Sequence, residues 1–175
     1  MIYTREQIEK AVKAKGYTYF TGPKNYDVNI VGVRNSAPGK KVTNIFDDKM
    51  TLSYKLDGVW QYHEWDNTTE PGKKGVMQYH NANGVARLVT GQYRGAYAIS
   101  KHQGKYDALC QRLGNVTVWR DKNKDMAFDE VTTDTGMFGI NIHKAGTISN
   151  FVENWSEGCQ VFKRTKDFNE FMAII

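Results

Sequence analysis

The sequence predicts a mainly β protein: one β-rich domain, sandwich or barrel-like, with a short helix at each end. Between residues 17 and 162, short runs recur that alternate apolar and polar residues or concentrate β-branched and aromatic residues. Pieces rich in Gly, Pro, Asn and Asp separate these runs. The 175 residues show no internal repeat or linker. At about 100–200 residues per domain, we therefore expect a single domain over residues 1–175.

The first predicted element is an amphipathic helix. Thr4 is followed three residues later by Gln7, the spacing of a capping box, and Ile8 and Val12 continue at helical spacing. Gly16 then ends the pattern. One short helix should therefore precede the β-rich part of the chain.

The rest of the chain is expected to form strands, one helical turn and a final helix. A helical turn is expected at residues 105–112, which include Cys110. A final helix is expected at residues 165–175, where four apolar side chains fall on one helical face. The strands are expected at residues 17–20, 26–33, 49–56, 85–89, 96–100, 115–119, 139–142 and 158–162.

Composition and charge exclude several classes of protein. The mean hydropathy is −0.61 and no apolar run approaches the ~18 residues of a membrane span, so we expect no membrane partner. The net charge is +5, but the basic residues are scattered among acids and no recognition motif accompanies them. We therefore expect no nucleic acid partner, and a mildly basic surface suits an anionic polymer such as a cell wall.

The most informative residues are a histidine and a cysteine. His143 ends one expected strand and Cys159 opens another. Cysteine attacks as the thiolate, and a positioned imidazole is the usual means of forming it. The Gly158 and Cys159 amides are placed to stabilise an oxyanion, and Ser156 to hold the loop or polarise a substrate. The alternative is a packed thiol and a structural histidine.

This order of residues resembles the L,D-transpeptidase (YkuD-type) catalytic domain, whose signature is a His followed after a loop by Ser/Thr-His-Gly-Cys. The resemblance covers residues 76–161, roughly half the chain, and the turn at residues 68–72 looks like the family's upstream Thr-Pro-x-Gly turn. It implies that His143 is the general base and Cys159 the nucleophile, with Ser156 and Gly158 matching the motif. The implied reaction is cleavage or exchange of a D-residue amide in peptidoglycan through a cysteine acyl-enzyme.

Two positions depart from that pattern. Glu157 stands where the motif has its second His, and Val161 where the family usually has Arg or Asn after the Cys. Recognition of a substrate carboxylate would therefore fall to another arginine. We assign substrate binding to His102, Arg94, Arg164, Glu157 and Trp155, with Arg120 as a further candidate.

Several sequence segments, including residues 29–34 and 156–162, also resemble a group of small phage-encoded proteins presumed to act on the cell wall. This second resemblance implies an endolysin-type hydrolase. No secretory signal peptide is recognisable at the N-terminus. We therefore expect a protein that is cytoplasmic when synthesised and acts on the host wall after holin release or as part of a virion. We expect a monomer whose partner is peptidoglycan.

An Asp-rich stretch suggests calcium. Asp121, Asn123, Asp125 and Asp129 occupy positions one, three, five and nine of a candidate loop, with a backbone carbonyl at seven. The Gly at six and the Glu at twelve of an EF-hand are missing. The alternative is a hairpin turn that uses Asp and Asn for turn chemistry. No cofactor is otherwise required, although a zinc peptidase using His102, His143 and a carboxylate is a further alternative.

The sequence thus favours a cysteine-dependent peptidoglycan peptidase or L,D-transpeptidase-like enzyme that cleaves or exchanges stem-peptide amide bonds. The alternative from another class is a non-catalytic phage structural or wall-binding module, in which Cys159 is only packed.

Overall fold

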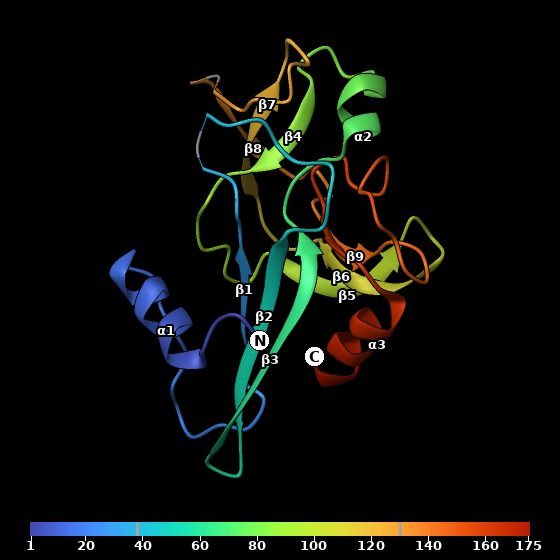
Figure 1. Ribbon diagram of the computed structural model, residues 1–175. Coiled ribbons are helices and arrows are strands. Elements are labelled where there is room, and N and C mark those ends of the chain that lie inside the picture. The colour runs from blue at the N-terminus through green and yellow to red at the C-terminus, as the bar shows by residue number, and fades with distance from the viewer. Residues whose placement is uncertain (38, 130) are drawn as a thin grey trace.

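The computed structural model describes residues 1–37, 39–129 and 131–175, and it confirms a mainly β fold with short helices near the two ends. Figure 1 shows a long curled sheet, a smaller sheet at one end of it, and a helix on either flank. No helix in the described ranges is both long and apolar enough to span a membrane.

Helix α1 (Arg5–Ala14) begins as the capping box predicts. The Thr4 N–H donates to Gln7 Oε1 at 2.8 Å, and the Gln7 N–H donates to Thr4 Oγ1 at 3.2 Å. These two bonds satisfy donors that the first helical turn would otherwise leave without acceptors. Ile8 is the buried residue of this helix.

The large sheet has the strand order β1-β2-β3-β10-β9-β6-β5. In the described part of the chain its neighbouring strands are antiparallel, except that β9 and β10 pair in parallel. Strands β5, β6 and β9 run across the direction of β1, β2 and β3 in Figure 1, which is the visible curl of the sheet. The strands are β1 (Asn29–Val33), β2 (Asp48–Leu56), β3 (Val59–Thr68), β5 (Tyr97–His102), β6 (Tyr106–Gln111), β9 (Ile142–Lys144) and β10 (Gln160–Phe162).

The small sheet consists of β4 (Val85–Leu88), β7 (Val116–Asp121) and β8 (Thr133–Gly136), in the order β4-β7-β8. Helix α2 (Lys73–Gln78) lies at the same end of the molecule (Figure 1). The small sheet has its own apolar core, which includes Val116 and Val118 from β7. The apolar core of the small sheet is therefore separate from that of the large sheet.

The main core lies between the large sheet and helix α3 (Thr165–Ile174). Phe168 and Phe171 of α3 are buried against the sheet, and Met172 and Ile175 pack beside them, so the predicted apolar face of the last helix is confirmed. The ring of Phe162 lies 5.1 Å from that of Phe171, centroid to centroid. This packing fixes β10 against α3.

A buried ionic group joins the two sheets. Arg87 of β4 donates to Glu70, the second residue after β3, at 2.5 Å. Arg34, directly after β1, donates to the Thr69 backbone carbonyl at 2.9 Å and to the Leu88 carbonyl at 3.0 Å. Burial lowers the pKa of Arg34 to about 10. Because the Glu70 and Arg87 side chains are each only 2% exposed, the pairing compensates charges that have lost their water.

The helical turn expected at residues 105–112 is wrong, because this segment contains the whole of strand β6. Ala108 and Cys110 are fully buried, whereas Asp107, the residue before Ala108, is exposed. Burial therefore follows the two-residue period of a strand. The strand expected at residues 139–142 begins only at Ile142. The strand expected at residues 17–20 is not formed, and these residues are irregular. The Phe20 N–H donates to Asn29 Oδ1.

Besides β6, the described chain contains two strands and one helix that the sequence patterns do not predict: β3, β8 and α2. Strand β3 follows β2 through a tight hairpin, in which Asp57 and Gly58 have φ of 51° and 80°. Positive φ at both central residues is the geometry of a type I′ turn, which an Asp-Gly pair favours. The Asp57-Gly58 pair is a local turn signal in the sequence, whereas β3 itself lacks an equally local signal.

Candidate active site

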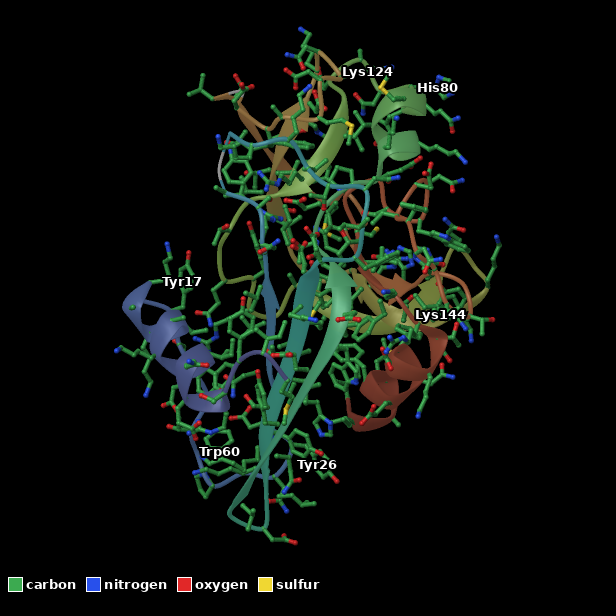
Figure 2. All side chains as sticks on the ribbon, in the orientation of Figure 1. Tyr17, Tyr26, Trp60, His80, Lys124 and Lys144 are labelled. Carbon is green, nitrogen blue, oxygen red and sulfur yellow. The ribbon has the colours of Figure 1, made fainter. Side chains whose placement is uncertain are left out.

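The parallel pair β9–β10 brings His143 and Cys159 to one part of the molecule. His143 lies opposite Val161 in the register, and Cys159 is two residues before Val161, directly before β10. Because side chains alternate between the faces of a sheet, His143, Val161 and Cys159 are expected on the same face. Figure 2 labels Lys144, the last residue of β9, above α3 on the right of the molecule.

His143 is buried in its neutral form. Its Nδ1 bonds to the backbone carbonyl of Lys144 at 2.9 Å, and since a carbonyl only accepts, Nδ1 must carry the proton. Burial and the neighbouring His102 lower the pKa of His143 to about 4. The ring therefore presents an unprotonated Nε2 at neutral pH, as a general base requires.

Cys159 rests as a protonated thiol. Its Sγ accepts the Asn141 backbone N–H at 3.4 Å and donates to the Gly139 carbonyl at 3.5 Å. Burial raises the pKa of Cys159 to about 11, the Asn141 N–H opposes the rise and Glu157 adds to it, although the residue keeps some exposed surface. The thiol must therefore lose its proton as it attacks, rather than beforehand.

The loop before Cys159 is held by Ser156. Ser156 Oγ donates to the Cys159 carbonyl at 2.8 Å and accepts the Gly158 N–H at 3.2 Å. Of the two roles expected for Ser156, the geometry favours holding the loop. The Gly158 amide already has an acceptor in this arrangement, whereas an oxyanion role for the Cys159 amide stays a prediction.

Glycine is required at position 158 by both backbone and space. Its φ is +124°, which side chains of L-residues rarely allow, and a Cβ there would lie 2.8 Å from the Ala86 carbonyl oxygen of β4. The close approach brings the small sheet against the Cys159 loop.

The turn at residues 68–72 packs against the same loop. The Gly72 N–H donates to the Ser156 carbonyl at 2.9 Å, and the Gly75 N–H donates to the Glu153 carbonyl at 3.1 Å. A Cβ on Gly72 would lie 2.1 Å from the Glu153 carbonyl oxygen. This turn therefore supports the position of the loop that carries Cys159.

His102 is the one expected substrate-binding residue that the structure places in ring contact with His143. It is only 8% exposed, so it does not lie on the open surface. Its ring stacks on His143 with centroids 4.0 Å apart and an interplanar angle of 17°. Its Nδ1 bonds to Asn141 Nδ2 at 3.1 Å.

The other expected binding residues lie in three places. Glu157 and Trp155 are exposed on the loop before Cys159, with Trp155 close to Gly146. Arg164 lies at the start of α3, 3.9 Å from Asp66. Arg94 lies over the ring of Phe20 at 5.1 Å. Arg120, the further candidate, lies 4.7 Å over the ring of Phe138.

The Asp-rich loop uses its oxygens for turn hydrogen bonds. Asp121 accepts the Met126 N–H at 2.9 Å, Asn123 accepts the Asp125 N–H at 3.1 Å, and Asp125 accepts the Ala127 N–H at 2.8 Å. Asp129 is exposed. Across residues 1–37, 39–129 and 131–175, no group of three His, Cys, Asp or Glu side chains is arranged to hold a metal ion. This geometry matches the turn alternative, and calcium stays an untested prediction.

The Asp-rich loop is also remote from the cysteine and histidine. Figure 2 labels Lys124 of that loop at the end of the molecule that carries α2 and His80, far from Lys144 at the end of β9. A cation held there would therefore act on stability rather than on chemistry at Cys159.

Sequence reasoning missed Asn141 and Gln111. The Asn141 backbone donates to Cys159, its Nδ2 contacts His102, and its Oδ1 accepts the Gln111 N–H at 3.0 Å. The Gln111 side chain accepts the N–H groups of Phe138 and Ile140 at 3.2 and 3.1 Å, which shapes the segment before Asn141. The alternation that places Asn141 two residues before His143 was a signal available in the sequence.

Comparison with known proteins finds no matching family model, no matching curated protein and no matching solved structure.

Proposed function

We propose that the protein is a cysteine-dependent peptidase or L,D-transpeptidase-like enzyme that cleaves or exchanges stem-peptide amide bonds of peptidoglycan. One observation supports the proposal: the parallel pairing of β9 and β10 sets neutral His143, with Nδ1–H held by the Lys144 carbonyl, opposite Val161, the second residue after Cys159. The alternation of side chains along a strand favours one face for His143 and Cys159, and an acceptor nitrogen and a nucleophile are the two groups that acyl transfer needs.

The proposed reaction begins with attack of the Cys159 Sγ on an amide carbonyl carbon. The thiol proton passes to His143 Nε2 as the carbon–sulfur bond forms. His143 then returns this proton to the leaving amine as the carbon–nitrogen bond breaks, which leaves a thioester on Cys159. Water as the second acceptor gives hydrolysis and regenerates the thiol, whereas an amine gives exchange.

The substrate class is supported by charge and motif. The net charge of +5 suits an anionic wall polymer. The order of His143, Ser156, Gly158 and Cys159 resembles that of wall-acting enzymes, and Trp155 and Glu157 are exposed beside the cysteine, where a substrate would approach. We propose the same setting for the protein in the cell, that is, synthesis in the cytoplasm and action on the host wall.

The test is digestion of purified peptidoglycan followed by mass analysis of the released fragments. Wild type should release stem-peptide fragments and Cys159→Ala should release none. His143→Gln should lose about 10²–10⁴-fold in rate, the usual contribution of a general base. Cys110→Ala is the matched control, because Cys110 is a second buried thiol that packs in the core, and it should retain the rate. Equal activity of wild type and Cys159→Ala would refute the proposal.

One observation favours a second candidate, a wall-binding module without catalysis. The thiol of Cys159 rests on backbone partners, and the loop before it exposes Ile148, Phe151 and Trp155, by 63%, 58% and 43%. Exposed aromatic residues suit binding to sugars or peptides. Under this alternative, wild type and Cys159→Ala would sediment equally with peptidoglycan and neither would release fragments.

A further inference from the structure

The hydrogen bonds around Asn141 fix which atom of its side chain faces His102. The Gln111 backbone N–H, which can only donate, bonds to Asn141 Oδ1 at 3.0 Å. The other end of the amide, Nδ2, must therefore be the group 3.1 Å from His102 Nδ1. Because the Asn amide nitrogen only donates, His102 Nδ1 is an acceptor and its ring proton lies on Nε2.

His143 has the opposite arrangement. Its Nδ1 donates to the Lys144 carbonyl, so its proton lies on Nδ1 and its lone pair on Nε2. The two stacked rings, with centroids 4.0 Å apart, are thus opposite tautomers. Each tautomer is set by a partner other than the second histidine.

The surroundings of the pair oppose protonation of either ring. His102 faces Lys105 and Arg112, both cationic, and the ring of Tyr106 at 5.6 Å. Its Nδ1 already faces a donor, Asn141 Nδ2, which would repel a second proton there. Among the described residues, the groups acting on His143 are His102 and the Lys144 carbonyl. Burial, with Arg112 and Lys105, lowers the pKa of His102.

We propose that His102 is a positioning residue, locked by Asn141 as the neutral Nε2–H tautomer, whose stacked ring orients His143 and keeps its Nε2 free to accept a proton. The tautomer assignment stands on hydrogen-bond geometry alone. Only its use in proton transfer from Cys159 rests on the proposed function.

The direct test is nitrogen-15 NMR with long-range correlation to the ring protons, which reports the tautomer and charge of each histidine. The chain has four histidines, so assignment by single substitution is practical. In wild type at pH 7, we expect His102 as Nε2–H and His143 as Nδ1–H, both neutral. Finding the same tautomer on both rings, or a cationic His102, would overturn the proposal.

The decisive variant is Asn141→Asp. One carboxylate oxygen still accepts the Gln111 N–H, while the other faces His102 Nδ1 as an acceptor, so His102 should become protonated at pH 6. A charged ring 4.0 Å from His143 should disfavour protonation of His143 during attack. We expect kcat/KM at pH 6 to fall about tenfold or more, with recovery as the pH rises and His102 loses its proton.

His102→Phe separates stacking from charge, because it keeps an aromatic ring and removes both nitrogens. It should retain more activity than His102→Ala and show no loss confined to low pH. Amide spectra of each variant verify folding, and Asn141→Ser serves if Asn141→Asp does not fold. With Asn141→Ser, the hydroxyl is too short to hold both partners, so a fixed His102 tautomer identical to wild type would count against the proposal.

If wild type leaves peptidoglycan intact while the two tautomers are as assigned, the proposed function fails and the tautomer assignment survives.

Discussion

His143 couples its own protonation to the stability of the fold. Its pKa is lowered to about 4 in the folded protein, against about 6.5 in an unfolded chain. Between these two values the unfolded state binds more protons than the folded state, so acid favours unfolding. The stabilisation is complete above about pH 6.5 and is lost as the pH falls toward 4.

We therefore predict that the free energy of unfolding in urea falls by up to about 3 kcal/mol between pH 7 and pH 4 through His143 alone. Carboxylates contribute to the same pH range, so the measurement needs a difference. His143→Gln should show a smaller fall than wild type, whereas His80→Gln, at an exposed position, should show the same fall. Equal falls in all three proteins would contradict the prediction.

Gly158 is the second residue whose role is set by its position. A Cβ there would meet the Ala86 carbonyl oxygen at 2.8 Å while the backbone is held at φ +124°. We predict that Gly158→Ala lowers the free energy of unfolding by more than about 2 kcal/mol, because it combines a close contact with backbone strain. Gly104→Ala is the control, since Gly104 has φ +72° but open space around it, and it should cost about 1 kcal/mol in thermal or urea unfolding. A smaller loss for Gly158→Ala than for Gly104→Ala would show that the loop yields easily.

At the scale of the elements, the buried ionic group is the main link between β3 and β4. Removing Glu70 leaves the Arg87 guanidinium, 2% exposed, without its carboxylate. We predict that Glu70→Ala lowers the free energy of unfolding by about 3–5 kcal/mol, the usual cost of an uncompensated buried charge. Asp107→Ala removes the exposed pair with Lys101 and should cost no more than about 1 kcal/mol. Urea unfolding of the two variants compares the pairs, and similar losses would contradict the prediction.

The elements that sequence patterns predicted well are those whose signal is local. Helix α1 has a capping box and helix α3 an apolar face, and both are confirmed. Strand β2 was expected at residues 49–56 and is observed as Asp48–Leu56. In each case the residues that define the element lie next to one another in the chain, so periodicity and end signals suffice.

The elements that the sequence did not predict correctly depend on partners that are distant in the chain. Strand β6 contains no β-branched residue, and only its pairing with β5 and β9 shows which of its small residues face inward. Strand β3 presents His63 and Trp65 to Glu170 of α3, whereas Trp60 lies on the opposite face under Arg5 of α1, so the burial of each face is set by a distant segment. At the candidate site, the sequence named His143 and Cys159 but missed Asn141, because its three hydrogen-bond partners come from elsewhere in the chain.

At the scale of the whole molecule, the expectation of a single domain leads to a measurable prediction. Arg34 and Glu70 of the large-sheet side contact Leu88 and Arg87 of β4, and Gly158 packs on Ala86. We predict that both sheets unfold together. Fluorescence of a variant retaining only Trp65, in the large sheet, and of one retaining only Trp119, in the small sheet, should each give the same urea midpoint as far-UV circular dichroism of that variant. Within either variant, a tryptophan midpoint separated from the circular dichroism midpoint would mean that the two sheets unfold separately.

Strand β10 is the last strand in the chain, yet it lies in the middle of the large sheet, between β3 and β9. During synthesis, β1, β2 and β3 can pair with one another, and β5 and β6 can do the same, before residue 160 leaves the ribosome. The two halves then carry unpaired edges until β10 joins them. A chain that stops before residue 159 lacks the joining strand, so premature termination should yield aggregation-prone products.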